Sequence, residues 1–203
     1  MSGAADLPRR TAARTADGLS REAWTTSRTR MAYDALLRRG LAPGAAWAAA
    51  TALMGHWAIE TGWGRSEWNG NVGNIKVGSG WNGPIHELTD GLLYRSYDTP
   101  DAGADDAVRL ASETERYRAA WAYLVSTGDG RGWYDRLMRA GWHPWSEDAL
   151  TTYASTWSRV RNTVGQTAPG APAAGLSGWS TAAWVGLGAG VAWWAHRVWT
   201  RGR

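Results

Sequence analysis

A single glutamate, Glu60, stands between an apolar stretch and a glycine-rich turn in the segment HWAIETGWGRSEWNGNVGNIK, residues 56–76. Trp57 and Trp63 lie close to it on either side, so the charged form of this carboxyl would be poorly solvated. A helix that ends here would also expose Glu60 to backbone carbonyls whose partial charge disfavours an anion. A carboxyl that keeps its proton near neutral pH can act as a general acid on a sugar. The alternative on position alone is an exposed glutamate at a helix end.

Polar and aromatic side chains are concentrated in the residues that follow Glu60. Amide and cationic groups on a turn can bind the acetamido and hydroxyl groups of a glycan, and the candidates are Arg65, Asn71, Asn74 and Lys76, the last being the only lysine of the chain. Tryptophan rings can stack on sugar faces or fill a core, and the candidates are Trp63, Trp68 and Trp81. We expect Trp68 and Trp81 to face a ligand, whereas Asn71 and Asn74 could equally serve only to form the turn.

The histidines offer an alternative chemistry. His56 and Glu60 are four positions apart and would share one face of a helix, and His86 and His143 could complete a metal shell. The His-Glu-x-x-His signature of metallohydrolases does not occur in the sequence. We therefore expect no metal ion and no other cofactor, and loss of activity with a chelator would overturn this expectation.

Two helices are predicted to lead up to Glu60. Residues 21–39 carry apolar side chains at helical spacing and form an amphipathic helix. Residues 41–61 begin with Pro43 near a first-turn position, end at Gly62, and are apolar almost all round. This pattern predicts a central, buried helix with Glu60 in its last turn.

The chain after Glu60 changes its pattern twice. Residues 64–98 mix glycine, asparagine and tryptophan with the short runs PIHEL and LLYRSY, which predicts loops and a small β-hairpin. Helical spacing returns at 103–125, 132–141 and 146–160, with Ser146 as the N-cap of the last helix. The predicted fold class is mainly α (α+β), with one irregular β-lobe inserted after the central helix.

The composition indicates one domain and excludes several classes of protein. A chain of 203 residues can form one core with appendages, and the absence of cysteine excludes disulfides and thiolate metal sites. The net charge of +4 and the pI near 9.8 favour a polyanionic partner such as nucleic acid, anionic lipid or a phosphate-bearing cell wall. No helix-turn-helix or aromatic RNA-binding motif occurs, so we expect no specific nucleic-acid partner.

The two ends of the chain differ from its middle. Residues 1–18 offer little apolar surface, contain no secretory signal, and are predicted to form a flexible basic arm. The domain is expected at 19–162 and an Ala/Pro/Gly linker at 163–178. Residues 179–199 are apolar with tryptophans at their ends, and a basic tail follows at 200–203. These features predict a transmembrane or membrane-associated helix.

The pattern Glu-Thr-Gly-Trp-Gly-Arg, followed by an asparagine-rich turn that ends in Gly-Asn-Ile-Lys, resembles a known enzyme family. It is similar to the N-acetylglucosaminidase domain of bacterial peptidoglycan hydrolases, glycoside hydrolase family 73, which occurs in flagellar-rod wall hydrolases and phage lysins. The resemblance extends over residues 21–160. It implies a lysozyme-like fold with a small β-lobe, peptidoglycan glycan strands as the substrate, and Glu60 as the general acid.

The resemblance also implies a second catalytic group and a cleft tyrosine. The family often places a carboxylate on the β-lobe before an aromatic-arginine-aromatic strand, where it activates water or stabilises oxocarbenium character. In IHELTDGLLYRSYD the matching residue is Glu87, with Asp90 as the less favoured substitute, although Ile85 stands where the family has threonine. For the tyrosine near the end of the domain, Trp142 and Tyr153 are the two candidates.

Several alternatives to an endo-β-N-acetylglucosaminidase stay open. Lytic transglycosylases and muramidases act on the same polymer with related motifs, and a transglycosylase would not need Glu87. A protein of another class, a non-catalytic virion or wall-binding component, could retain the fold without activity. The expected membrane helix without a secretory signal favours tail-first insertion or delivery by a phage particle during genome entry or lysis. The domain would then face the cell wall from the membrane, or travel in the virion with virion proteins as partners.

Overall fold

The computed structural model describes the chain from residue 6 to residue 169, with gaps at 17, 79 and 167. The chain divides into a compact unit at Met1–Gln166 and a second unit at Thr167–Arg203. The predicted membrane helix at 179–199 and the basic tail at 200–203 lie outside the described residues. Within the described part, no helix is long and apolar enough to cross a membrane.

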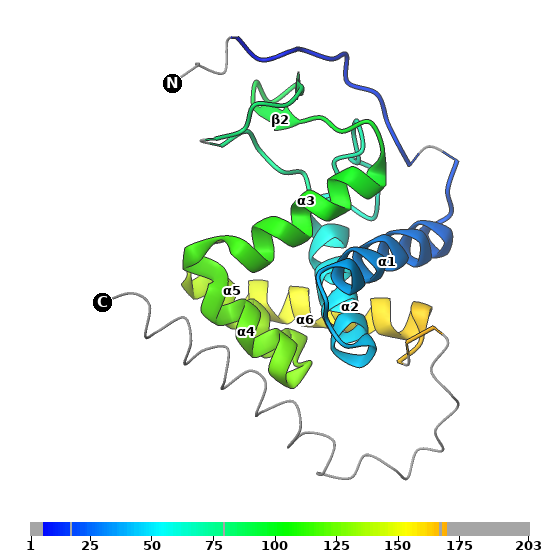
Figure 1. Ribbon diagram of the computed structural model, residues 1–203, viewed down its shortest axis with the longest axis vertical. Helices are drawn as coiled ribbons and strands as arrows, with labels where there is room; N and C mark the ends of the chain where they lie inside the picture. Colours follow the sequence, from blue (N-terminus) through cyan, green and yellow to red (C-terminus); the bar gives the residue numbers. More distant parts are fainter. Residues whose placement is uncertain (1–5, 17, 79, 167, 170–203) are drawn as a thin grey trace. The chain divides into compact units, whose positions relative to one another are not determined.

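The first two helices form where the sequence predicts them (Figure 1). Helix α1 spans Arg21–Arg38, and the hydroxyl of its N-cap Ser20 accepts a hydrogen bond from the backbone N–H of Ala23. Helix α2 spans Pro43–Glu60 with proline in its first turn, and most of its side chains are buried. It packs against α1, α4, α5 and α6, so the central helix is confirmed and Glu60 is its last residue.

Four more α-helices complete the helical body in the described part of the chain. Helix α3 spans Pro100–Glu113, α4 Arg118–Thr127, α5 Gly130–Arg139 and α6 Glu147–Val164. The prediction of one continuous helix at 103–125 is wrong, because Thr114 adopts an extended conformation and a 3₁₀ turn, Glu115–Tyr117, separates α3 from α4. The predicted N-cap of α6 is confirmed, since the Ser146 hydroxyl accepts from the backbone N–H of Ala149.

A glycine inside α2 permits close packing of three helices. A Cβ atom added at Gly55 would lie 2.5 Å from the Tyr134 hydroxyl of α5 and 3.0 Å from the Trp157 Cα of α6. The Tyr134 hydroxyl fills this space and donates a 2.7 Å hydrogen bond to the Ala52 carbonyl. The intrinsic cost of a mid-helix glycine is thus offset by close contact between α2, α5 and α6.

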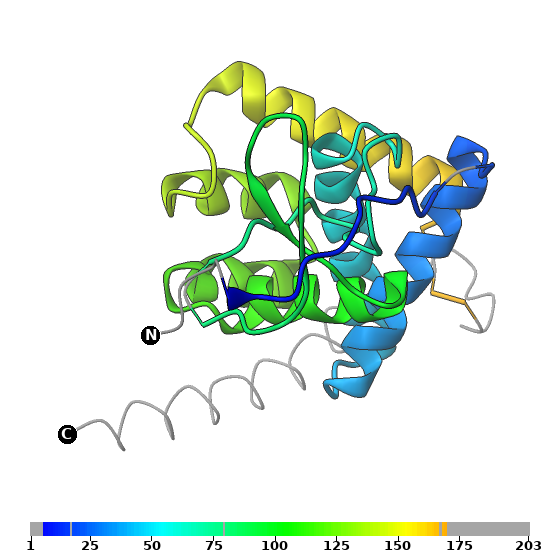
Figure 2. The ribbon, with the colours of Figure 1, turned by 90° about the horizontal axis from the view of Figure 1, so that it is seen from above.

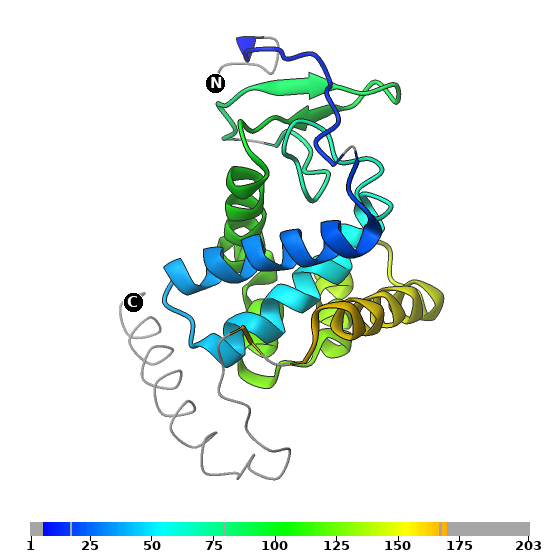
Figure 3. The same ribbon diagram turned by 90° about the vertical axis from the view of Figure 1, so that its right-hand side faces the viewer.

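The β-lobe stands at one end of the helical body, as Figures 1 and 3 show. Strand β1, Ile85–Glu87, pairs antiparallel with β2, Leu93–Arg95, and His86 lies opposite Tyr94. A further bridge links Lys76 to Tyr94 on the outer side of β2. The predicted hairpin is confirmed, and its small size means that surrounding loops must hold it in place.

The N-terminal segment is ordered along this lobe, so the prediction of a flexible arm is wrong for residues 8–15, the N-terminal strap (Figure 2). Ile85 donates its N–H to the Pro8 carbonyl and accepts from the N–H of Arg10, both at 2.8 Å, which adds a parallel bridge beside β1. Farther along, the N–H of Asn69 donates to the Ala13 carbonyl at 2.8 Å. Backbone hydrogen bonds, which composition does not reveal, account for the order.

A buried ion pair supports the turn that follows α2. Glu67 is fully buried, and Arg28 of α1 donates to its two carboxylate oxygens at 2.9 and 2.6 Å. The indole Nε1 of Trp24 donates a third hydrogen bond to Glu67 at 2.7 Å. A Cβ atom at Gly64 would lie 2.7 Å from this same indole nitrogen, so only glycine fits there. The turn is therefore tied to α1 immediately after Glu60.

Candidate active site

Glu60 ends α2 at a place where the chain turns sharply away. After Thr61, three successive residues have a left-handed backbone: Gly62, Trp63 and Gly64, with φ angles of 58°, 61° and 85°. A bulky residue in this region is strained, and such strain persists only where surrounding structure imposes it. Here the Thr61 hydroxyl bonds both sides of the turn, donating to the Trp57 carbonyl and accepting from the N–H of Gly64. The turn leaves the Glu60 side chain at an open helix end.

Two side chains approach the carboxyl group of Glu60. The hydroxyl of Tyr153, from α6, donates a 2.9 Å hydrogen bond to Oε1. The Nε2 atom of His56, one turn earlier on α2, lies 4.0 Å from the same oxygen. The Glu60 side chain is 30% exposed, so it reaches solvent more than its apolar sequence context suggests. The arrangement is a carboxyl oriented by one strong partner and accessible from outside.

The electrostatics of both neighbours are set by burial. The pKa of Tyr153 is raised by burial and further by the Glu60 charge, so its hydroxyl stays a hydrogen-bond donor over the physiological range. The pKa of His56 is lowered by burial, which the Glu60 charge partly offsets and His143 reinforces. His56 is therefore neutral near pH 7. Of the two residues left open for the cleft tyrosine, Tyr153 contacts Glu60, whereas Trp142 packs on His56 with ring centroids 4.8 Å apart.

One face of the β-hairpin carries groups that feel the charge of Glu60. The Tyr94 hydroxyl donates a 2.8 Å hydrogen bond to Asp90 Oδ2. The pKa of Tyr94 is raised to about 12 by burial, by Asp90 and also by the charge of Glu60. Hydrogen bonds from the Leu92 N–H and from Tyr94 lower the pKa of Asp90, with a contribution from the Lys76 charge. Asp90, Tyr94 and Lys76 thus interact with one another on this side of the lobe, and Tyr94 is the member whose pKa the Glu60 charge raises.

Glu87 lies on the other face of the hairpin. Side chains alternate along a strand, and His86 stacks with Tyr94 at a centroid distance of 5.7 Å, so Glu87 projects to the opposite side. There its carboxylate pairs with the Arg9 guanidinium of the N-terminal strap at 3.0 Å. The structure therefore separates the two candidate lobe carboxylates, with Asp90 beside Tyr94 and Glu87 beside the strap.

The two asparagines of the turn bond the protein itself. Asn71 is buried, donates to the carbonyls of Ile75 and Arg95, and accepts from the N–H of Ile75 at 2.7 Å. Its amide is thus used in forming the loop, which is one of the two roles that the sequence left open for Asn71. Asn74, with a left-handed φ of 48°, donates to the backbone carbonyl of Glu60. This bond caps the open end of α2 and fixes the loop next to the carboxyl.

Each of the three candidate tryptophan platforms has an arginine over its ring. Arg21 lies 5.1 Å from the centroid of Trp63, and Arg95 lies 4.8 Å from that of Trp81. The third pair is Arg14 of the strap over Trp68, at 5.2 Å. All three rings are partly exposed, so a sugar could stack only on the side away from the cation.

The remaining polar candidates, Arg65 and Lys76, are exposed. Arg65 donates to the Gly62 carbonyl at 3.0 Å, and Lys76 is exposed on the strand edge beside Tyr94. His86 lies 2.9 Å from the Ser96 hydroxyl within the lobe. Among the residues that the structure describes, no three His, Asp or Glu side chains gather into a possible metal site. The arrangement gives no support to the metal-shell alternative.

Two further side chains, His56 beside Glu60 and Trp145 in the loop that carries Trp142, were not predicted from the sequence as glycan-binding residues. His56 was considered only as a metal ligand, yet it is 5% exposed and directly behind the Glu60 carboxyl. Trp145 is 46% exposed, has Arg139 over its ring at 4.7 Å, and bonds Asp135 through its indole nitrogen. The tryptophan-rich loop GWHPW was a visible signal for Trp145, but the many tryptophans of the chain weakened it.

Comparisons with known proteins agree with the fold. No family model and no curated protein matches the sequence. Among solved structures, the glycoside hydrolase domain of Salmonella typhimurium FlgJ matches with a TM-score of 0.56 and 19% identity, covering 71% of this chain and 90% of that one. A peptidoglycan hydrolase from Sphingomonas sp. A1 matches with a TM-score of 0.57 and 23% identity, covering 77% and 99%. The predicted fold class, a mainly helical domain with a small β-lobe, is confirmed.

Proposed function

We propose that this protein hydrolyses the glycan strand of bacterial peptidoglycan, as an endo-β-N-acetylglucosaminidase with Glu60 as its general acid. The proposal draws on structures of the same fold that are described as a glycoside hydrolase domain and a peptidoglycan hydrolase. The observation that carries it is the placement of Glu60 itself. It is a partly exposed carboxyl at the end of a buried helix, with a 2.9 Å hydrogen bond from Tyr153 to one oxygen.

In this proposal each oxygen of Glu60 has a distinct role. Oε1 receives the Tyr153 hydroxyl and faces His56. Oε2 has no hydrogen-bond partner among the described residues, so it is the oxygen that would carry the proton to the glycosidic bond. Tyr153 fixes the orientation of the carboxyl and stabilises the carboxylate left after proton transfer, because it remains a donor.

A lobe carboxylate completes the proposed mechanism, and we assign it to Asp90 rather than Glu87. Asp90 stays ionised because two hydrogen bonds stabilise its carboxylate, and its partner Tyr94 feels the Glu60 charge. A carboxylate in this position would activate water or stabilise the oxocarbenium character that develops at the sugar. Glu87, which the sequence favours, pairs with Arg9 on the opposite face of the hairpin.

Digestion of purified peptidoglycan by the full chain and by Glu60→Gln tests this proposal. Mass spectrometry of the fragments should show reducing N-acetylglucosamine ends for the wild type and none above background for the variant. Reducing N-acetylmuramic acid ends would indicate a muramidase, and anhydro ends a lytic transglycosylase. If a folded wild type releases no Glu60-dependent fragments from several wall types, a non-catalytic wall-binding or virion protein becomes the better assignment.

The site of action stays a prediction. Membrane association rests on residues 179–199, which lie outside the described residues. Delivery by a phage particle rests on that segment and on the resemblance to phage lysins. Separation of membranes from soluble fractions after expression of the full chain, compared with residues 1–166, tests the membrane prediction directly.

A further inference from the structure

His56 is a buried polar side chain one helical turn before Glu60 on α2. The side chain is 6% exposed, and neither of its ring nitrogens, Nδ1 and Nε2, has a hydrogen-bond partner among the described residues. The Nε2 atom lies 4.0 Å from Oε1 of Glu60. Buried polar atoms in proteins are normally hydrogen-bonded, so an unbonded imidazole directed at a carboxyl group calls for an explanation.

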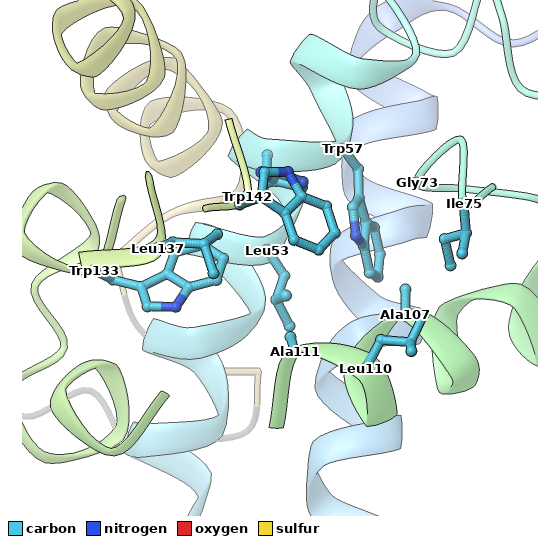
Figure 4. A pocket seen from close by; sticks show the side chains of 11 residues that line it. Leu53, Trp57, Gly73, Ile75, Ala107, Leu110, Ala111, Trp133, Leu137 and Trp142 are labelled. Carbon is cyan, nitrogen blue, oxygen red and sulfur yellow. The ribbon is translucent and has the colours of Figure 1, made fainter. Parts of the chain in front are cut away.

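Aromatic rings hold the imidazole of His56 in place. Its centroid lies 4.8 Å from that of Trp142, 5.5 Å from that of Tyr153 and 6.2 Å from that of Trp133. Figure 4 shows Trp133 and Trp142 around the small apolar pocket that His56 also lines. The three rings come from α5, α6 and the loop between them, so the imidazole has little freedom to rotate away from Glu60.

The contact with Glu60 determines which ring nitrogen of His56 carries the hydrogen. Burial lowers the pKa of His56, so the ring is neutral near pH 7 and has one N–H donor and one acceptor nitrogen. Oε1 of Glu60 already accepts a hydrogen bond from Tyr153, so a second neighbour can bond this oxygen only as a donor. Nε2 therefore carries the hydrogen, because its lone pair would otherwise face the lone pairs of Oε1.

The 4.0 Å separation between Nε2 and Oε1 is too long for a hydrogen bond, and it can shorten during the reaction. Catalytic hydrogen bonds are often long in a protein without substrate and tighten in the complex. The Glu60 side chain is 30% exposed and can move toward the fixed ring of His56. Negative charge that develops on Glu60 strengthens the attraction, since a hydrogen bond to an ionised acceptor is about twice as strong as one to a neutral acceptor.

We infer that His56 is a positioning residue of the acid, which donates a hydrogen bond from Nε2 to Oε1 of Glu60 as the proton leaves Oε2. In this step the proton moves from Oε2 to the glycosidic oxygen, the C–O bond breaks with its electron pair on that oxygen, and Glu60 becomes a carboxylate. His56 stays neutral and keeps its own hydrogen. Together with Tyr153 it holds Oε1 inside the protein and leaves Oε2 for the substrate. This inference rests on the proposed function for the reaction.

Two substitutions separate the N–H donor of His56 from its bulk. His56→Gln keeps an N–H donor on a side chain of similar reach, whereas His56→Leu has none. With soluble peptidoglycan fragments and the full chain, His56→Leu should lower kcat about tenfold with KM nearly unchanged, because the bond forms only as the reaction proceeds. His56→Gln should recover most of this loss. A folded His56→Leu variant with the kcat of wild type, or equal losses in the two variants, would overturn the inference.

A spectroscopic measurement on the folded wild type covers the case in which His56→Leu does not fold. Nitrogen NMR of the full chain labelled in histidine, at about pH 7.5, reports which ring nitrogen carries the hydrogen, and the signals missing from His56→Gln identify His56. We expect the hydrogen on Nε2, with an Nε2 signal that shifts in Glu60→Gln and not in Glu87→Gln. A hydrogen on Nδ1, or an Nε2 signal that ignores Glu60→Gln, would overturn the inference.

The two readouts also keep this inference apart from the proposed function. The NMR signals of His56 are measured without substrate, so they report its contact with Glu60 whether or not the protein cleaves peptidoglycan. Absence of Glu60-dependent fragments would contradict the proposed reaction. Cleavage that depends on Glu60 but is equally fast in folded His56→Leu would contradict the role of His56 alone.

Discussion

Glu60 and Glu67 lie on either side of one turn, and their surroundings are opposite. Glu67 is fully buried, bonded through both oxygens to Arg28 and through one to Trp24. Glu60 is 30% exposed and receives one hydroxyl. Both carboxylate oxygens of Glu67 are hydrogen-bonded to other side chains, whereas among the described residues only Oε1 of Glu60 is. The difference indicates that Glu67 holds the turn in place and that Glu60 keeps one carboxylate oxygen without a described partner.

The comparison also explains the residues between the two glutamates. The left-handed backbone at Gly62, Trp63 and Gly64 turns the chain from the open helix end to the buried ion pair. The contact of Gly64 with the Trp24 ring links the two regions directly. The strained turn next to Glu60 is thus held in place by Glu67, whose two carboxylate oxygens are both hydrogen-bonded.

The largest expected effect on stability comes from Glu67→Gln. This change leaves the Arg28 guanidinium buried without a counter-charge, so the free energy of unfolding should fall by about 3–5 kcal/mol. Urea denaturation measures it, with Glu113→Gln, an exposed glutamate at the end of α3, as the control that should change stability by less than about 0.5 kcal/mol. A small effect at Glu67 would remove the contrast between the two glutamates.

The next effect distinguishes the two lobe carboxylates. Asp90→Asn should lower the rate of peptidoglycan cleavage about 100-fold, because it removes the charge that faces the developing oxocarbenium character. Glu87→Gln should change the rate less than about threefold, since its partner Arg9 is an exposed surface residue. The reverse order in a turbidity assay would restore Glu87 as the second catalytic group.

A smaller effect is expected from the partner of Glu60. Tyr153→Phe removes the hydrogen bond that the Tyr153 hydroxyl donates to the carboxyl and should lower kcat about tenfold with KM nearly unchanged. The matched control is Tyr123→Phe on α4, which removes a hydroxyl that bonds Asp129 at the start of α5. An unchanged kcat in Tyr153→Phe would show that Glu60 needs no orienting partner.

The smallest expected effect concerns pH. The pKa of His56 is lowered from its ordinary value of 6.5 by burial, so below that value the unfolded chain binds more protons than the folded one. The free energy of unfolding should therefore fall as pH decreases below 6.5, and His86, whose pKa burial also lowers, contributes with the same sign. Denaturation at about pH 7.5 and about pH 5.5 should show a smaller loss for His56→Gln than for wild type. An identical loss would indicate that His56 is already charged when folded.

Local signals explain why much of the fold is predictable from the sequence. The N-cap Ser146 and the proline at the start of α2 place two helices correctly, and apolar residues at helical spacing place α1. The break at Thr114 has no glycine or proline to announce it. Helix α3 packs against α1 and α4 packs against α2, so the bend depends on tertiary contacts. Amino-acid composition does not predict the order of the N-terminal strap, because this order comes from backbone hydrogen bonds to the lobe.

The candidate site is predictable only in part. Glu60 can be found because a lone carboxyl between an apolar helix and a glycine turn is unusual. The partners of Asn71 depend on where Ile75 and Arg95 meet it, and the role of His56 depends on the position of Trp142. The contacts of Asn71 with Arg95 and of His56 with Trp142 join residues distant in the chain, which spacing along the sequence cannot show.

The most direct test compares Glu60→Gln with Glu67→Gln in the same preparation, by peptidoglycan digestion and urea denaturation. Glu60→Gln should lose about 1,000-fold in cleavage rate while its free energy of unfolding stays within about 0.5 kcal/mol of wild type. Glu67→Gln should instead lose stability and, at a temperature where it remains folded, keep most of its rate. A Glu60→Gln variant that cleaves peptidoglycan at a rate close to wild type would contradict the assignment of Glu60 as the catalytic acid.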